Sequence, residues 1–293
     1  MRIRSVIRWT VRIVAGTVAL ILIAVAGVYG YSNVRMARRF TVPEHPIHFR
    51  TDSATLAAGK RLVTVRGCVD CHGAALGGNV MFDDPAIGRL AAPNLTLGGR
   101  GAAMEPRDWE RAIRHGVRRD GTSLRVMPAQ EFTTIADDEL EAMVSYIRSV
   151  PPVTATLPSP RAGPIILALY VAGQVKLLPG EEVDHTKPHA THVEPEVTAQ
   201  YGAYLAAGCT GCHGPTLSGG KIPGAPPDWR PAANITPAGI GHYSEADFIR
   251  VLREGKRPDG SSVDSLMPWR LTKSITDVEL KAVYAYLRSV PTK

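Results

Sequence analysis

The sequence predicts an all-α protein in which one membrane-spanning helix precedes two tandem copies of a small helical domain. A run of nineteen uncharged residues, Ile13 to Tyr31, lies near the N-terminus. Two later segments carry the same landmarks in the same order, and apolar residues in both recur at helical spacing. We therefore expect an anchor or signal segment at 1–34, domains at 50–153 and 195–293, and a linker at 154–194.

The uncharged run suits one crossing of a bilayer, which takes about 20 residues at 1.5 Å each. Four arginines precede it, which favours an N-terminus in the cytoplasm and export of the remaining chain. A cleaved signal peptide is an alternative, because Ala24-Val25-Ala26 has the small-x-small pattern of a cleavage site. A helix buried in a soluble protein is the third possibility.

The net charge of +7 belongs to the N-terminus. Residues 1–40 hold seven arginines and no acid, so residues 41–293 hold 34 − 7 = 27 basic and 27 acidic groups. A basic face for nucleic acid is therefore not expected.

Each copy is predicted to contain three main helices, bounded by glycine, proline or acidic residues. They cover residues 54–66, 106–116 and 136–149 in the first copy and residues 202–207, 245–253 and 276–289 in the second. Residues 32–50 are expected to be a spacer that holds the first domain off the bilayer. The apolar run 165–172 is too short to cross a membrane, so we expect it to pack on one of the domains.

The repeat is clearest at a six-residue motif. Cys68-Val69-Asp70-Cys71-His72-Gly73 recurs 141 residues later as Cys209-Thr210-Gly211-Cys212-His213-Gly214. Further landmarks follow at offsets of 139 or 140: Asn94 and Asn234, Gly121 and Gly260, Met127 and Met267, Tyr146 and Tyr286, Pro151 and Pro291.

All four cysteines lie in these two C-x-x-C-H motifs, a pattern typical of c-type haem attachment. Two thiols three positions apart at a helix end can bond both vinyl groups of one macrocycle, and the next residue presents an imidazole to the iron. We therefore predict two covalently bound haem c groups. Their predicted attachment residues are Cys68, Cys71, Cys209 and Cys212, and their iron ligands are His72 and His213.

Other uses of the cysteines fit less well. A redox-active C-x-x-C pair is typical of a βαβ context, which the sequence does not predict. A zinc site would need two further ligands at finger-like spacing. A disulfide within each motif would close a very short loop of little stabilising value.

Met127 and Met267 are the candidates for the second axial position. They lie 55 and 54 residues after the motif histidines, and each precedes a proline. Met267 is the only methionine of the second half, whereas Met81, Met104 and Met143 compete with Met127 in the first. Met143 falls inside the last helix of its copy and is expected in the core.

The remaining histidines are expected to have no special role. His115 stands at a helix end, where a cation is favoured. His185, His189 and His192 lie in the linker and are expected in solvent, with a metal site as the alternative.

Three other residue pairs are expected to act in the same way in both copies. Pro85 and Pro226, thirteen residues after each motif histidine, could place a carbonyl that holds the imidazole. Asn94 and Asn234 are expected to have a structural or haem-edge role. Tyr146 and Tyr286 are expected to pack the last helix against the first.

With these motifs, each copy resembles a class I cytochrome c domain. The second copy is similar to domains of the cytochrome c subunits of membrane-bound bacterial alcohol, aldehyde and gluconate dehydrogenases. The residues that carry this are Asn234-Ile235-Thr236-Pro237, Gly239-Ile240-Gly241, Met267-Pro268 and Tyr286 to Pro291. The first copy departs at Gly98 to Ala103, and those subunits commonly carry three domains where this chain has two.

The resemblance implies a membrane-anchored di-haem electron carrier that makes no bond in a substrate. It would pass electrons between a periplasmic or membrane dehydrogenase and the respiratory chain, through a soluble cytochrome or a terminal oxidase. The expected location is the bacterial inner membrane, with the N-terminus in the cytoplasm and both haem domains in the periplasm. One alternative is a di-haem enzyme of the peroxidase or thiosulfate-oxidising type with an open haem site; another is a sensing or docking module.

Overall fold

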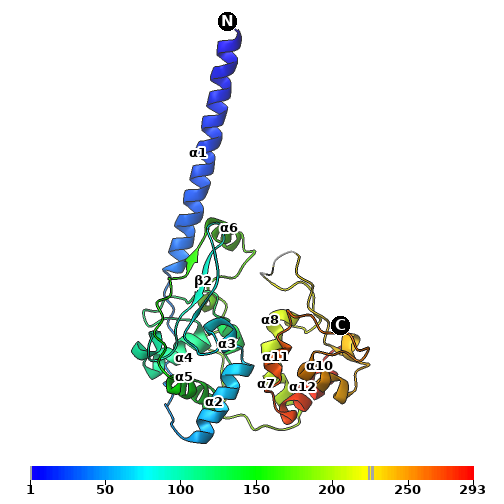
Figure 1. Ribbon diagram of the computed structural model, residues 1–293. Coiled ribbons are helices and arrows are strands. Elements are labelled where there is room, and N and C mark those ends of the chain that lie inside the picture. The colour runs from blue at the N-terminus through cyan, green and yellow to red at the C-terminus, as the bar shows by residue number, and fades with distance from the viewer. Residues whose placement is uncertain (1, 224, 226–227) are drawn as a thin grey trace.

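The computed structural model describes residues 2–223, 225 and 228–293. A long helix projects from a body in which two helical units lie side by side (Figure 1). We call residues 50–153 the first repeat and residues 195–293 the second repeat.

The projecting helix is α1 (Arg2–Met36), about 52 Å long at 1.5 Å per residue. Within Ile3–Met36, the most apolar stretch of 18 residues has a mean hydropathy of 2.4, and none of this stretch is buried in the protein. The helix is thus long and apolar enough to cross a membrane, as the uncharged run predicts.

The helices of the first repeat surround the first motif. They are α2 (Ser53–Val65), α3 (Cys68–His72), α4 (Pro106–His115) and α5 (Asp137–Ser149), with short 3-10 turns η1 (Arg100–Ala103) and η2 (Ala129–Glu131). Asp52 begins α2 by accepting a hydrogen bond from the backbone N–H of Thr55. The close crossing of α2 and α5 requires Gly59, because a Cβ there would lie 2.0 Å from the carbonyl oxygen of Ala142.

The second repeat has the same order of main helices. Its elements are α7 (Ala199–Ala206), η4 (Ala207–Cys209), α8 (Thr210–His213), α9 (Pro237–Ile240), α10 (Glu245–Glu254), α11 (Trp269–Thr272) and α12 (Asp277–Ser289). The crossing of α7 and α12 repeats that of α2 and α5, with a Cβ on Gly202 only 2.0 Å from the Ala282 carbonyl oxygen. Tyr146 and Tyr286 lie at these crossings, as predicted.

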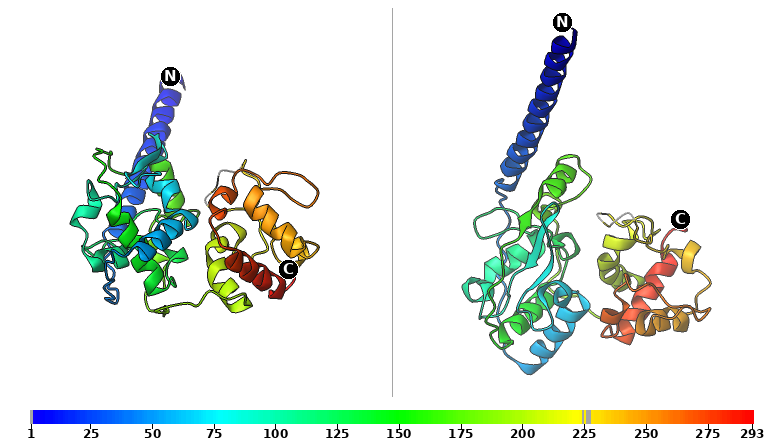
Figure 2. Two further views of the ribbon diagram at one scale, coloured as in Figure 1. Left: turned by 60° about the horizontal axis from the view of Figure 1, so that its bottom comes forward. Right: turned by 45° about the horizontal axis from the view of Figure 1, so that its top comes forward.

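The prediction of an all-α fold is wrong for one part of the first half. Strands β1 (Asn79–Asp84), β2 (Gly88–Ala92) and β3 (Arg161–Ala162) form an antiparallel sheet in that order. The Asp84 carboxylate accepts hydrogen bonds from the backbone N–H groups of Ala86 and Ile87, which closes the turn between β1 and β2. This hairpin and the sheet are visible beneath α6 in Figure 2.

The segment after α1, predicted to be a spacer, packs along the first repeat. The backbone N–H of Phe40 donates to the carbonyl of Gly121 at 2.8 Å, and Ile47 is buried in the core. The linker packs on this half as well, through α6 (Pro164–Val171) and η3 (Pro179–Glu181). The apolar run 165–172 thus becomes α6, which contacts α1 and Ala162 beside the sheet.

The two repeats have cores of unequal size. Thirteen buried apolar residues form the first cluster, which we call the first core; Trp109, Leu140 and Met143 are at its centre. Seven form the second core, among them Phe248, Leu280 and Leu287. A third cluster joins α6 to Val28 and Met36 of α1.

Candidate haem-attachment sites

The two C-x-x-C-H motifs end in the same turn. The first motif lies on α3, whereas in the second Cys209 is the last residue of η4 and α8 begins at Thr210. Both helices end at a glycine with a positive φ, Gly73 (φ 77°, ψ 159°) and Gly214 (φ 77°, ψ 166°). The carbonyl of the motif histidine then accepts a backbone hydrogen bond from Gly78 at 2.8 Å or from Gly219 at 2.9 Å. Two segments 141 residues apart therefore share the turn that follows the motif histidine.

Each motif histidine is oriented by a backbone carbonyl. Nδ1 of His72 lies 2.8 Å from the Pro93 oxygen, and Nδ1 of His213 lies 2.7 Å from the Ala233 oxygen. A carbonyl only accepts, so Nδ1 carries the proton and Nε2 of the neutral ring is free to bind a metal. Burial lowers the pKa of His72, which favours this neutral form, although the hydrogen bond to Pro93 acts against it.

The prediction that the Pro85 carbonyl holds the His72 ring is wrong. The carbonyl of Pro93 holds it instead. The equivalent prediction for Pro226 falls outside the described residues. Pro93 and Ala233 directly precede the repeated Asn-x-Thr sequence, a signal that could have identified them.

None of the four motif cysteines forms a disulfide in the described structure. Burial raises the pKa of Cys68 to about 12 and that of Cys209 to about 11, and it also raises the pKa of Cys71 and Cys212. No set of three His, Cys, Asp or Glu side chains in the described part of the chain is arranged to hold a metal ion.

Met127 and Met267 lie in equivalent loops. The following prolines have nearly the same backbone angles, Pro128 (φ −79°, ψ 57°) and Pro268 (φ −78°, ψ 47°), and both methionine carbonyls accept a backbone hydrogen bond at 2.8 Å from two residues on. Both side chains are half-buried. Met127 packs on the first core together with Cys68, and Met267 packs on the second core together with Cys209.

The competing methionines differ in position. Met143 is 1% exposed inside α5, so its prediction as a core residue is confirmed. Met81 is exposed on β1. Met104 and Met127 both pack on the first core. Met127 is preferred as the iron ligand because it alone is equivalent in position to Met267.

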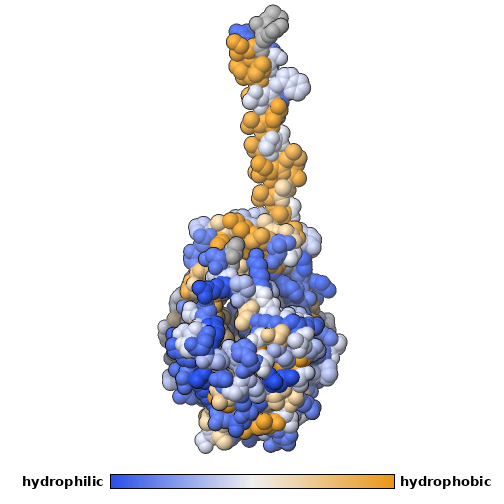
Figure 3. All heavy atoms as spheres, turned by 90° about the vertical axis from the view of Figure 1, so that its right-hand side faces the viewer, coloured by the Kyte–Doolittle hydropathy of each residue, from blue (hydrophilic) through white to orange (hydrophobic). Residues whose placement is uncertain are grey.

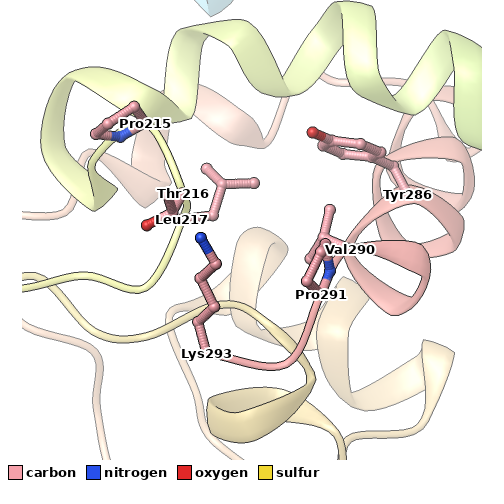
Figure 4. Close-up of a pocket in the computed structure, with 7 residues that line it drawn as sticks. All are labelled: Pro215, Thr216, Leu217, Tyr286, Val290, Pro291 and Lys293. Atoms are coloured by element: carbon pink, nitrogen blue, oxygen red, sulfur yellow. The ribbon is translucent and has the colours of Figure 1, made fainter.

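The surroundings of the motifs fit a large apolar cofactor. Beside the second motif, apolar side chains are only partly buried and would be covered by a macrocycle bonded to Cys209 and Cys212: Leu205, Ile235, Tyr243, Ile249, Ile275, Tyr284, Tyr286 and Val290. Figure 4 shows Leu217, Tyr286 and Val290 turned toward a pocket of about 200 Å³, to whose lining Cys209, Cys212, His213 and Met267 do not contribute. Two thiols, a bare imidazole nitrogen, a thioether and apolar walls form the donor set of a c-type haem.

The prediction did not include Leu76 and Leu217, which lie four residues after each motif histidine. Both are buried with a positive φ, 56° and 60°, which is rare for leucine. Their carbonyls accept hydrogen bonds at 2.9 Å from the backbone N–H of Leu95 and Ile235. The repeated Gly-x-x-Leu spacing after the histidine is the sequence signal of this turn.

Asn94 and Asn234 have the predicted structural role. Each side-chain amide donates to a carbonyl at the end of its repeat, Val153 or Lys293, at 2.5 Å. Each side-chain oxygen accepts from the backbone N–H of the threonine two residues later. The asparagine thus ties the loop after the motif to the last residues of the repeat.

The linker histidines are packed more closely than predicted. His115 is 4% exposed, with Nδ1 3.1 Å from Nδ1 of His185 and Nε2 3.3 Å from Glu110. His189 contacts Asp137 at 3.0 Å. The prediction of a solvated linker is wrong for His185 and His189, because carboxylates and His115 of the first repeat partner them, whereas His192 is exposed.

The two repeats meet beside both motifs. Arg61 of the first repeat pairs with Glu279 of the second at 2.8 Å. The Tyr204 hydroxyl of the second repeat donates to Glu139 of the first at 2.6 Å, and Glu139 also pairs with Arg66. A Cβ on Gly211, inside the second motif, would lie 2.4 Å from Glu131.

A reciprocal contact lies at the first motif. A Cβ on Gly67, just before Cys68, would lie 3.8 Å from Leu271. Glu131 and Leu271 each follow a Met-Pro pair, so each motif adjoins the methionine loop of the other repeat.

Comparisons with known proteins find one family match in each half of the chain. Residues 54–147 match the family described as cytochrome C oxidase, cbb3-type, subunit III, and residues 199–291 match the family described as cytochrome c.

Among curated proteins, the chain is 28% identical over 274 residues to the alcohol dehydrogenase (quinone) cytochrome c subunit of Gluconacetobacter polyoxogenes, covering 82% of this chain and 57% of that protein. It is 27% identical over 286 residues to the fructose dehydrogenase cytochrome subunit of Gluconobacter japonicus, with 86% and 56% covered. It is 24% identical over 278 residues to the gluconate 2-dehydrogenase cytochrome c subunit of Pantoea cypripedii, with 83% and 61% covered. The chain therefore spans little more than half the length of these relatives.

Proposed function

Since residues 54–147 and 199–291 are two cytochrome c family domains, we propose that the chain is a membrane-anchored electron carrier with one covalent haem c in each repeat. The domain borders that we propose are those of the two repeats, with residues 154–194 as the linker. Bound there, haem iron supplies reversible one-electron chemistry.

The proposed attachment residues are the four motif cysteines. Cys68 and Cys71 would bond the vinyl groups in the first repeat, and Cys209 and Cys212 would do so in the second. The ring nitrogens Nε2 of His72 and His213 would bind the iron as one ligand, and the sulfur atoms of Met127 and Met267 are proposed as the other. A methionine–histidine pair leaves no coordination position for substrate and raises the reduction potential.

The observation that carries this function is the equality of the two donor sets. Each histidine has a carbonyl on Nδ1 at 2.7–2.8 Å, and each methionine lies in a Met-Pro loop of the same backbone geometry. A di-haem enzyme of the peroxidase or thiosulfate-oxidising type needs one iron with an open position, and hence two unlike sites. Equal sites favour the carrier.

The interface between the repeats supports transfer from one centre to the other. Each motif adjoins the methionine loop of the opposite repeat, and the Arg61–Glu279 pair and the Tyr204–Glu139 hydrogen bond lie between the repeats. An electron that enters at one repeat can therefore leave by the other without a large movement of the chain.

We place α1 across the bacterial inner membrane, with the arginine-rich N-terminus in the cytoplasm and both repeats in the periplasm. The names of the relatives indicate a dehydrogenase subunit as electron donor. The acceptor would be the respiratory chain, through a soluble cytochrome or a terminal oxidase. A periplasmic location also supplies the oxidising compartment in which c-type cytochromes work.

The test is a redox titration of the detergent-extracted full chain, together with mass spectrometry of its tryptic peptides. We expect haem on the peptides of both motifs and two reversible one-electron transitions. The matched variants Cys68→Ala/Cys71→Ala and Cys209→Ala/Cys212→Ala should each remove one transition. Haem on one motif only, or a transition that is not reversible, would contradict the carrier.

A further inference from the structure

Helix α6 presents an exposed apolar face. Ile165 is 51% exposed and Leu169 is 38% exposed, and they are one helical turn apart on the same face. Residues 162–175 contain no charged side chain, and basic residues, Arg161 and Lys176, stand at the two ends. Such a face in a small helix is costly in water and needs a cover.

The opposite face of α6 packs on the membrane helix. Leu167 and Tyr170 are 3% and 4% exposed, and they form a cluster with Val28 and Met36 of α1. Val28 lies within the uncharged run that ends at Tyr31, about 4.5 Å from that end along the helix. α6 therefore reaches the level of the last turn of the apolar segment.

The figures show the same placement. α6 lies next to the lower end of α1 in Figure 1, and in Figure 2 it rises beside that end. Figure 3 shows apolar side chains gathered on the body around the base of α1.

A polar cluster fixes α6 in this position. The Arg35 guanidinium donates to Glu181 at 3.0 Å, the Tyr170 hydroxyl donates to the same carboxylate at 2.8 Å, and the Arg35 guanidinium lies 4.7 Å from the centre of the Tyr170 ring. Arg35 belongs to α1 and Tyr170 to α6. These contacts therefore fix the height of α6 relative to α1.

The first repeat is attached to α6 by backbone hydrogen bonds. Ile165 donates to the carbonyl of Ala86 at 3.0 Å, and Gly163 donates to the carbonyl of Ile87 at 2.9 Å. Ile87, at the turn between β1 and β2, is 43% exposed and adds to the apolar surface beside α6.

We propose that α6, with Ile87 beside it, lies in the interfacial layer of the same bilayer that α1 crosses. This inference rests on the proposed anchoring by α1. Lipid is the occupant because α6 is continuous with the apolar part of α1, and an apolar helix face inserts about 5–10 Å into the boundary between headgroups and acyl chains. The first repeat then rests on the membrane, at a fixed height.

The experiment uses the full haem-loaded chain in phosphatidylcholine nanodiscs that contain a photoactivatable diazirine lipid. After irradiation, trypsin releases α6 in a peptide of residues 162–176, and residues 274–281 serve as the control peptide. The control peptide contains Val278, whose exposed fraction of 38% equals that of Leu169. We expect lipid adducts on residues 162–176 and on α1, and none on residues 274–281.

The variant Ile165→Glu/Leu169→Glu should lose the adducts on residues 162–176 and keep those on α1. Val278→Glu is the matched control and should change neither. Both sites are exposed, and an unaltered visible spectrum of each variant shows that the repeats are folded.

Adducts on α1 but none on residues 162–176 in the wild-type chain would overturn the inference and leave a protein partner as the cover of α6. Adducts on neither segment would instead contradict the proposed anchoring by α1.

Discussion

The two repeats have one ligand framework but differ in how the protein supports it. Their motif turns, histidine carbonyl partners and methionine loops agree closely in backbone geometry. Among the described residues, the first core has thirteen buried apolar residues, one of which, Ile47, comes from the segment after α1, whereas the second core has seven. Since burial of apolar area drives folding, the second repeat depends more on the cofactor than the first.

The repeats also differ in what each motif faces across the interface. The second motif adjoins the carboxylate of Glu131, and the first motif adjoins the apolar Leu271, at the equivalent position of the other methionine loop. Geometry is therefore shared, while the charge near the two centres is not.

The largest expected effect is the loss of haem attachment. Cys209→Ala/Cys212→Ala should unfold the second repeat, because its seven-residue core lacks the apolar mass of the cofactor. Cys68→Ala/Cys71→Ala should leave the first repeat partly folded on its larger core. Limited proteolysis with haem-stained gels measures this, and equal protease sensitivity of the two variants would contradict the difference.

Methionine replacement tests the equality of the donor sets. Met127→Ala and Met267→Ala should each retain haem and lower the potential of their own centre by roughly 0.2 V, within the ~0.8 V range that axial ligands control. Met81→Ala, on the exposed β1, and Met104→Ala are the controls and should shift nothing. A shift in Met104→Ala with none in Met127→Ala would assign the ligand to Met104 instead.

Core truncation tests the difference in packing. Trp109 and Phe248 lie at equivalent positions on α4 and α10 and are 1% and 6% exposed. Trp109→Ala should destabilise the first repeat by about 4–5 kcal/mol and Phe248→Ala the second by about 3 kcal/mol. Denaturant unfolding of the haem-loaded chain measures both, and a larger loss for Phe248→Ala would reverse the comparison.

The smallest expected effect concerns Glu131. Burial raises the pKa of Glu131 to about 7, although the charge of Arg66 acts against this. As the pH rises through 7, the new negative charge beside the second motif favours oxidised iron, and the potential of that centre should fall by roughly 20–60 mV. The first centre, beside Leu271, should not respond.

Glu131→Gln is the test, followed by redox titration between pH 6 and 8. It should abolish the pH dependence of the reduction potential at the second centre, and a dependence that persists would assign it to another group.

The raised pKa of Glu131 also affects the stability of the protein. Ionisation is unfavourable in the folded state, so stability should decrease as the pH rises from about 4.5 through 7 in the wild-type chain and not in the variant.

Local signals predicted the helices and the attachment motifs well. α5 and α12 begin within one residue of the predicted start, because acidic residues mark their first turns. The start of α7 was missed by three residues, although Thr198 caps it by accepting from the N–H of Tyr201. The motif cysteines and histidines stay predicted haem-binding residues, and their C-x-x-C-H spacing is the signal that indicates them.

Features that depend on tertiary contacts were not predicted. The hairpin of β1 and β2 has no strand counterpart in the described part of the second repeat, so the repeat gave no support for it, and strand formation depends on context. The polar composition of the linker did not reveal its packing, because the half-buried His185 and His189 lie beside His115 and Asp137 of the first repeat. The carbonyls of Pro93 and Ala233 lie about twenty residues from their histidines and were identified only in the folded chain.

The central claim is that both centres are six-coordinate carriers supported by two alike donor sets. The most direct measurement is the optical spectrum of the reduced, detergent-extracted protein with two haems counted, before and after addition of carbon monoxide. We predict an unchanged spectrum, because His72 with Met127 and His213 with Met267 would occupy both axial positions of each iron. Ready binding of carbon monoxide by one centre would contradict the account and bring forward the enzyme with an open haem site.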